Sequence, residues 1–168
     1  YEIFNNLKIP GTEVLGWPDN FYHSSEDSPD KTDPTQLHRV VFTGLAAMTM
    51  IAYADDEQAG DVGRLSFVYG RRRIQSSEML ASQIILSATA ENLFENERQV
   101  GNILRHVYRR EKGAIQSSNI FARVEPTRKS IEQTASMLND DEAVSIRNIG
   151  DLASAKAGGL GVQRKEVP

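Results

Sequence analysis

A loop centred on His23 carries the residue types in this chain that are best suited to chemistry. Tyr22 precedes the histidine, and hydroxyl and acidic residues fill positions 24–27. A neutral imidazole is a good zinc ligand, a phenol can donate a hydrogen bond to a developing oxyanion, and a carboxylate can orient a metal ligand. The chain contains no cysteine, so any zinc that it binds must be held by His, Asp or Glu.

Simpler interpretations of the same residues stay open. His23 could be a loop histidine that hydrogen-bonds locally, and Tyr22 could be a packing residue. Trp17, beside Pro18, is interpreted as an anchor for the loop rather than as a platform for substrate. Asp27, with its neighbours Asp30 and Asp33, could form a calcium loop, but the glycine and the terminal Glu of the EF-hand pattern are missing.

Three other polar features are interpreted without a catalytic role. His38 and His106 are predicted to lie on helix surfaces. The run 71–73 consists of three arginines, which is a weak signal for phosphate or nucleic acid because no aromatic residues are interleaved with it. We interpret the run as a solvated flank.

The order of residues around His23 resembles a known arrangement. Tyr-His-Ser at 22–24 is followed by Asp-Ser at 27–28 and by a helix that begins after Asp33. This order is similar to the last metal-ligand loop of the co-catalytic two-zinc aminopeptidases, the relatives of bacterial leucine aminopeptidases and of glutamate carboxypeptidase. The resemblance covers residues 12–54, roughly a quarter of the chain.

The resemblance implies a role for each matching residue. His23 would bind one of two zinc ions, and Tyr22 would stand near the oxyanion. Asp27 would close the loop or orient a ligand. A zinc-bound water becomes a usable nucleophile near neutral pH, so the implied reaction is hydrolysis of a peptide substrate that releases N-terminal residues.

The chain also departs from the family pattern. The family site needs an upstream His, a bridging Asp, a pair of Glu residues and another acid, all before the Tyr-His loop, whereas only about twenty residues precede that loop here. We therefore expect the remaining ligands to lie on an upstream catalytic segment of the same protein, and this chain alone to be inactive. The first residue is Tyr rather than Met, which fits a piece of a longer or processed protein.

The elements that would position the loop can be predicted from local signals. A short strand is expected over 12–15. Asp33 suits the N-cap of a helix, and Pro34 suits its first position. The helix is predicted to run to about Ala54, with an apolar stripe so broad that we expect it to be mostly buried against a larger body. Residues 1–56 are thus interpreted as the C-terminal end of a zinc-peptidase domain.

Residues 57–168 are interpreted as a helical extension with a mobile tail. The glycine-punctuated stretch 55–75 is predicted to be a connector, and 76–110 a single long helix that ends near Gly113. A further helix is predicted over 127–138, and the small-residue tail 153–168 is predicted to be mobile. Apolar residues recur every seven positions along the long helix, which favours an intramolecular core and leaves a homodimer open; they are Leu86, Leu93, Val100 and Val107.

The bulk composition excludes several classes of protein. Hydrophobic residues make up 39% and charged residues 25% of the 168 positions, which is typical of a globular protein. No apolar run approaches the ~20 residues of a membrane span. A net charge of -4 argues against a general nucleic-acid binder.

The predicted fold is therefore mostly α: the terminal strand-loop-helix of an α/β zinc-peptidase domain followed by a helical extension. The expected function is that of the C-terminal segment of a zinc metallopeptidase of the aminopeptidase type. The alternative is a non-catalytic helical interaction or dimerisation module in which residues 1–33 are a linker. Localisation stays open, and the resemblance is compatible with a secreted or periplasmic protein.

Overall fold

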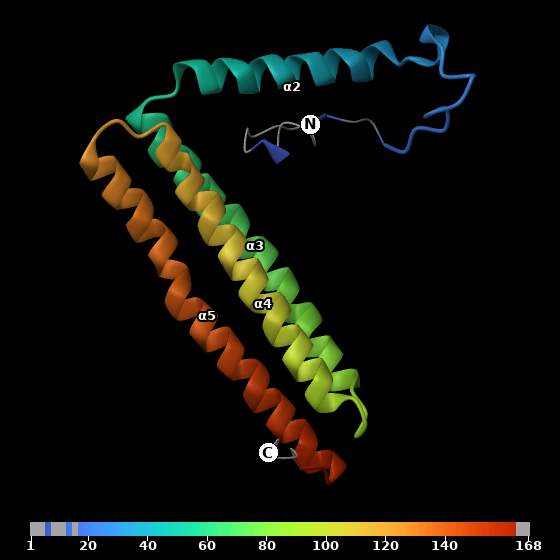
Figure 1. Cartoon of the computed structure of the whole chain (residues 1–168), viewed down its shortest axis with the longest axis vertical. Coiled ribbons are helices and arrows are strands. Elements are labelled where there is room, and N and C mark those ends of the chain that lie inside the picture. The colour runs from blue at the N-terminus through green and yellow to red at the C-terminus, as the bar shows by residue number, and fades with distance from the viewer. Residues whose placement is uncertain (1–5, 8–12, 15–16, 164–168) are drawn as a thin grey trace. The chain divides into compact units, whose positions relative to one another are not determined.

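All the regular secondary structure in the part of the chain that the structure describes is helical. The computed structural model describes residues 6–7, 13–14 and 17–163. In chain order the elements are the short 3-10 helix η1 (Pro29–Lys31), α2 (Pro34–Tyr53), α3 (Asp56–Ser87), α4 (Leu93–Gln116), η2 (Ser117–Ile120) and α5 (Glu125–Leu160) (Figure 1). The mostly α prediction is thus confirmed. Of the predicted strand, residues 12 and 15 lie outside the described residues, and Glu13 and Val14 are not in a strand.

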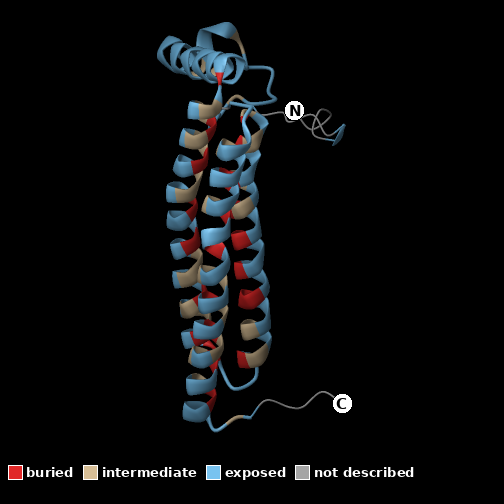
Figure 2. Cartoon of the chain, turned by 90° about the vertical axis from the view of Figure 1, so that its left-hand side faces the viewer, coloured by how far each residue is buried: buried red, intermediate tan, exposed pale blue. Residues whose placement is uncertain are grey.

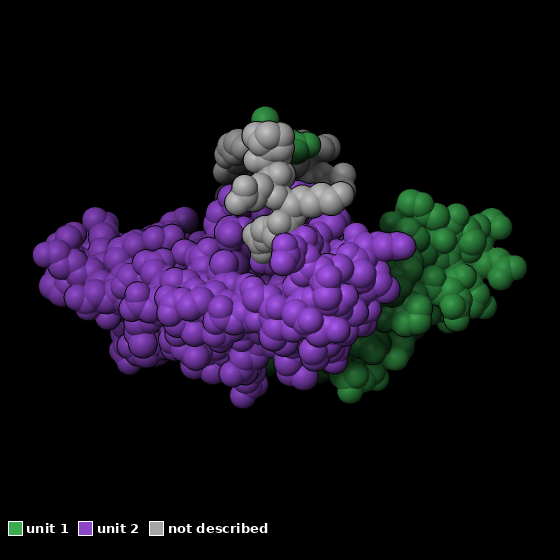
Figure 3. Space-filling model, turned by 90° about the horizontal axis from the view of Figure 1, so that it is seen from below, with its two compact units in different colours: residues 1–53 green, residues 54–168 purple. Residues whose placement is uncertain are grey.

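The chain divides into two compact units, residues 1–53 and residues 54–168 (Figure 3). The first unit contains the loop of His23 and α2. The second contains α3, α4 and α5. Each unit is described by itself below.

Helix α2 begins where the sequence predicts. The carboxylate oxygen Oδ1 of Asp33 accepts hydrogen bonds from the backbone N–H groups of Thr35 (2.8 Å) and Gln36 (3.4 Å), which confirms the predicted N-cap.

Within the described residues α2 is not buried, so the larger body against which burial was predicted is not found there. No residue of the helix is buried, and Leu45 and Met48 are 59% and 68% exposed. The described residues of this unit contain no second long helix or strand that could cover the apolar stripe. Periodicity therefore predicted the helix and its apolar side correctly, but burial needs a partner surface.

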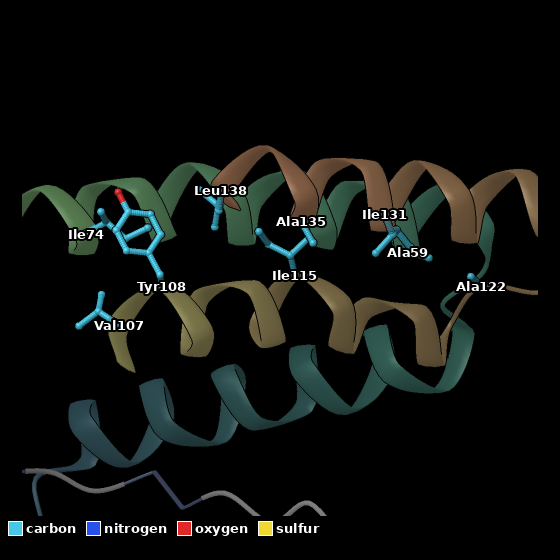
Figure 4. Close-up of a cluster of buried hydrophobic side chains, with 9 residues drawn as sticks. All are labelled: Ala59, Ile74, Val107, Tyr108, Ile115, Ala122, Ile131, Ala135 and Leu138. Atoms are coloured by element: carbon cyan, nitrogen blue, oxygen red, sulfur yellow. The ribbon is translucent and has the colours of Figure 1, made fainter. Parts of the chain in front are cut away.

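Helices α3, α4 and α5 form an antiparallel bundle in which each helix contacts the other two. Buried positions, coloured red in Figure 2, recur along all three helices. One core cluster, drawn in Figure 4, includes Ile74, Ile115, Ile131 and Leu138. The second cluster includes Leu104 and lies toward the α3–α4 turn.

The predicted connector 55–75 is wrong, because Asp55 is the N-cap of α3 and residues 56–75 form the first part of that helix. Asp55 is the N-cap of a capping box, with its side chain accepting from Glu57 N–H at 2.9 Å and its own N–H donating to Gln58 Oε1 at 3.1 Å. Acidic residues at a helix N-terminus are stabilised by the helix dipole. The acidic run therefore both follows the end of α2 and starts α3.

Two glycines of α3, Gly63 and Gly70, make room for neighbouring side chains. A Cβ at Gly63 would lie 3.1 Å from Ser118 Oγ, and a Cβ at Gly70 would lie 3.1 Å from Glu111 Oε2. Both glycines are buried against the rest of the bundle.

The predicted single helix 76–110 is also wrong. The chain leaves the helix at Ala88 and re-enters it at Leu93, so that α3 and α4 run antiparallel. Asn92 Oδ1 accepts a hydrogen bond from the N–H of Thr89 at 2.9 Å, which stabilises the turn. Leu93 is buried, whereas Leu86, its heptad neighbour in the sequence, lies on α3 and is 55% exposed.

The end of the chain is more helical than predicted. Helix α4 continues past Gly113 to Gln116, and the helix predicted over 127–138 extends over Glu125–Leu160. Residues 153–160 belong to α5 because Ala153 and Ala157 are buried in the second core cluster. The rest of the tail predicted to be mobile includes residues 164–168, which lie outside the described residues.

Among the described residues, no helix is both long enough and apolar enough to cross a membrane.

Candidate functional site

The loop that carries His23 is held by a tight turn. The N–H of Ser24 donates to the carbonyl oxygen of Phe21 at 2.9 Å, and the Ser24 hydroxyl donates to the same oxygen at 2.7 Å. Upstream, the N–H of Phe21 donates to Asp19 Oδ1 at 2.9 Å. His23 therefore occupies the third position of a four-residue turn.

His23 has a left-handed backbone conformation, with φ of 57°. This region favours glycine and costs a residue with a Cβ roughly 1–2 kcal/mol. Of the described residues, His23 is the one non-glycine residue with a positive φ. Left-handed non-glycine residues cluster at functional sites, so the backbone marks the same residue as the sequence motif.

The side chains of Tyr22 and His23 are stacked. Their ring centroids are 4.0 Å apart with an angle of 17° between the planes, and Trp17 meets the Tyr22 ring edge-on at 5.7 Å. Because the nitrogen lone pair of an imidazole lies in the ring plane, stacking covers a ring face and leaves the nitrogens open to a ligand. The ring of His23 has no hydrogen-bond partner among the described residues.

The structure places Asp27 beside the turn rather than against the imidazole. Its N–H donates to the carbonyl oxygen of Ser24 at 3.3 Å, and within the described part of the loop its carboxylate makes no hydrogen bond to His23. Asp27 also lines a cleft of about 570 Å³ between the loop and the start of α2, together with Lys31 and Leu37. The loop side of this cleft includes Trp17, which is 72% exposed.

A second turn connects the loop to α2. The hydroxyl of Ser28 donates to Asp30 Oδ1 at 2.5 Å, and Lys31 Nζ lies 2.9 Å from the other carboxylate oxygen. The hydrogen bond from Ser28 and the ammonium of Lys31 together lower the pKa of the Asp30 carboxyl. Lys31 also lies 5.5 Å from the centroid of the Phe21 ring, and this contact ties the second turn to the first.

The described residues do not form a complete zinc site. No group of three or more His, Asp or Glu side chains lies close enough together in the described part of the chain to hold a metal. His23 could serve as one ligand of a metal ion, since its ring is exposed and has no competing hydrogen bond within the described residues. His38 and His106 are exposed on α2 and α4, as predicted, and add no ligand to it.

The bundle contains a buried polar cluster that sequence reasoning missed. The hydroxyl of Tyr108 lies 3.0 Å from Glu78 Oε1 and 2.8 Å from Ser145 Oγ, and Ser145 also donates to Glu78. Burial raises the pKa of Tyr108 to about 12. The three groups satisfy one another's hydrogen-bonding capacity beside the first core cluster, to which Tyr108 belongs, so the arrangement is that of a structural network.

A second missed feature is Glu111, which is 1% exposed. Its carboxylate accepts two hydrogen bonds from Arg73, at 2.6 and 3.0 Å, and two from Arg110, at 2.6 and 2.9 Å. The hydrogen bonds from Arg73, followed by those from Arg110, lower the pKa of Glu111. The arginine run 71–73 is thus part of the bundle's ion pairing, since Arg71 also pairs with Asp141 at 2.6 Å.

Comparison with known proteins finds no relative of this chain. No family model, no curated protein and no solved structure matches the chain.

Proposed function

We propose that the chain is the C-terminal segment of a zinc-dependent hydrolase of the aminopeptidase type, to which it contributes His23 as a zinc ligand. The observation that supports this proposal is the conformation of His23: an exposed imidazole at a left-handed turn position, stacked on Tyr22 and without a protein hydrogen bond within the described residues. A histidine that served only the loop would need neither the strained backbone nor the open ring.

The neighbouring side chains have supporting roles in this proposal. Tyr22 fixes one face of the imidazole, and its hydroxyl would hydrogen-bond the oxyanion of the tetrahedral intermediate. Asp19 and Ser24 hold the turn through the bonds at 2.7–2.9 Å described above. Asp27 acts on the loop through its backbone. Zinc, when bound, supplies a water of lowered pKa and polarises the scissile carbonyl.

The remaining ligands would come from an upstream catalytic segment of the same protein, so this chain alone is inactive in the proposal. The character of α2 supports such a neighbour. Residues 40–54 contain no charged side chain, and Leu37, Leu45 and Met48 are each more than half exposed. A helix of this kind is stable when it packs on a sheet or on other helices.

Activity of the complete protein tests the proposal. We expect removal of zinc by a chelator to abolish release of N-terminal residues from a peptide, and His23→Ala to lower kcat/KM by at least ~10²-fold, as expected for loss of a group that acts in the transition state. His38→Ala, which changes an exposed histidine outside the loop, should leave kcat/KM unchanged. Equal activity of the two variants would contradict the proposal.

Tyr22 has a separate test because it has a separate role. If its hydroxyl stabilises the oxyanion, Tyr22→Phe keeps the ring stack, leaves KM nearly unchanged and lowers kcat by roughly 10²-fold. If Tyr22 only packs against His23, Tyr22→Phe has no effect on kcat, whereas Tyr22→Ala lowers zinc affinity.

The alternative is a helical interaction module without catalysis. It is favoured by the exposed apolar residues of α2 and α3, which suit association with other proteins. In that case neither His23→Ala nor a chelator changes any property of the complete protein.

A further inference from the structure

Helix α3 is apolar on two opposite sides. Its inner side packs in the bundle through small and branched residues, such as Gly70, Ile74 and Ala81. Its outer side carries six large apolar residues that are 49–66% exposed, here called the α3 stripe: Leu65, Val68, Tyr69, Met79, Leu80 and Leu86. At 100° per residue these positions fall within about a third of the helix circumference. Only the inner side is explained by the bundle.

Within the bundle, α3 carries the largest set of exposed large apolar residues, since α5 has only Met137, Val144 and Leu160. In α4, which the structure describes throughout, Ile103 is the one large apolar residue that is exposed. The stripe is also poor in charge. Between Leu65 and Leu86 its polar positions are Arg72, Ser76 and Gln83, and the run 65–86 contains a single acidic residue, Glu78, which turns inward to Tyr108.

The composition of the α3 stripe matches that of a protein interface. Aromatic residues, Met and Arg are enriched at interface cores, while Lys, Glu and Asp are depleted. The guanidinium of Arg72 lies 5.4 Å from the centroid of the Tyr69 ring, so the one charge on the stripe is already placed on an aromatic face. Burial of Arg72 therefore does not require a carboxylate on the partner.

The order of residues along the α3 stripe is self-complementary. Tyr69 and Met79 lie five residues before and after Ile74, and Val68 and Leu80 lie six residues before and after it. In an antiparallel pair of α3 helices related by a twofold axis near Ile74, Tyr69 of one copy meets Met79 of the other, and Val68 meets Leu80. Every contact occurs twice, as an isologous interface requires.

We propose that the α3 stripe joins two copies of this chain in an antiparallel, twofold-symmetric dimer. The available area is sufficient. The stripe extends over about 32 Å, and each of its six half-exposed side chains offers about 80–100 Å². Together with the polar positions between them, they approach the ~800 Å² that each partner buries in a standard interface.

Two Met→Glu variants, one on the α3 stripe and one on α5, test whether the α3 stripe forms the dimer interface. The mass of the complete 168-residue chain is measured by sedimentation over a range of concentrations. We expect twice 18.7 kDa for the unchanged chain and for Met137→Glu, which alters a Met of similar exposure on α5 (57%, against 66% for Met79). Met79→Glu should be monomeric, with an unchanged helical circular dichroism spectrum. An unchanged chain that stays monomeric, or a Met79→Glu variant that stays dimeric, overturns the proposal.

The orientation is tested by cross-linking, which is simple because the chain contains no cysteine. The double variant carries Val68→Cys and Leu80→Cys. In the proposed dimer, the thiol at position 68 of one copy lies beside the thiol at position 80 of the other, and a short bifunctional thiol reagent links the two. In either single variant the equivalent thiols lie about 18 Å apart along the axis and stay unlinked. Efficient linking of a single variant, or none of the double variant, contradicts the antiparallel arrangement.

Discussion

Glu111 shows how a charged residue is accommodated inside this bundle. A buried carboxylate without partners would be strongly destabilising, but here two arginines with half-exposed side chains reach in from α3 and α4. Both of its oxygens accept hydrogen bonds. The charge is thus compensated from the surface while the carboxylate stays in the core.

We predict that Glu111→Gln lowers the free energy of unfolding by about 1–3 kcal/mol at pH 7. Since the arginines lower the pKa of Glu111 in the folded chain, its contribution is present above the ordinary pKa and is lost as the pH falls through the folded value. The difference between the variant and the unchanged chain should therefore shrink below about pH 4.5.

Urea unfolding at pH 7 and pH 3.5 measures this difference. Glu95→Gln, which removes an exposed pair with Arg98, is the control and should have a much smaller effect at pH 7. A Glu111→Gln effect that is the same at both pH values would show that lost packing, rather than lost charge, causes it.

Glycine substitutions separate helix propensity from crowding. Gly113 and Gly70 are both helical, but a Cβ at Gly113 meets nothing within 4 Å, whereas one at Gly70 meets the fixed carboxylate of Glu111 at 3.1 Å. We predict that Gly113→Ala raises the free energy of unfolding by about 0.5–1 kcal/mol and that Gly70→Ala lowers it. Thermal unfolding of both variants measures this, and an equal gain in both would refute the role of Gly70 as space for Glu111.

At the scale of elements, the helices with local start signals were predictable. Asp33 followed by Pro34 fixed the start of α2, and Ile131, Ala135 and Leu138 identified the buried side of α5. The start of α3 carried a comparable local signal that was missed, because Asp55 and Gln58 form a capping box. Acidic residues at 55–57 are compatible with the end of one helix or the start of another, and the N–H groups of Arg123 and Val124, which lie between η2 and α5, add hydrogen bonds to Asp56 Oδ1 that no local pattern predicts.

The turn between α3 and α4 was missed for a related reason. Residues 87–92 contain neither Gly nor Pro, so neither of the strong helix breakers interrupts the heptad pattern. Asn92, whose side chain bonds back to Thr89, was the available signal. At the loop, the adjacency of Tyr22 and His23 was evident from the sequence, but the left-handed backbone of His23 was not, because glycine or asparagine is the usual residue there.

The division into two units leads to a prediction about the bundle. Residues 54–168 contain both core clusters and the ion pairs of Glu111, whereas α2 contributes no buried residue. We predict that a chain of residues 54–168 unfolds cooperatively, with a midpoint in urea within experimental error of that of the full chain. A non-cooperative transition of the shorter chain would show that the bundle depends on residues 1–53.

At the scale of the whole molecule, the two units present different apolar surfaces for different reasons. In the proposed function, α2 packs on the catalytic segment that supplies the other zinc ligands. In the proposed dimer, the α3 stripe packs on a second copy. The two ideas are independent, because the first depends on His23 and the second on Met79 and its neighbours.

Zinc affinity of the complete protein tests the central claim most directly. Competition with a chromophoric chelator would compare His23→Ala with His106→Ala, which removes an exposed histidine of α4. We predict that His23→Ala weakens zinc binding by more than the ~10–100-fold lost with an outer-shell partner, and that His106→Ala binds zinc like the unchanged protein. Equal zinc affinity of His23→Ala and the unchanged protein would contradict the assignment of His23 as a ligand.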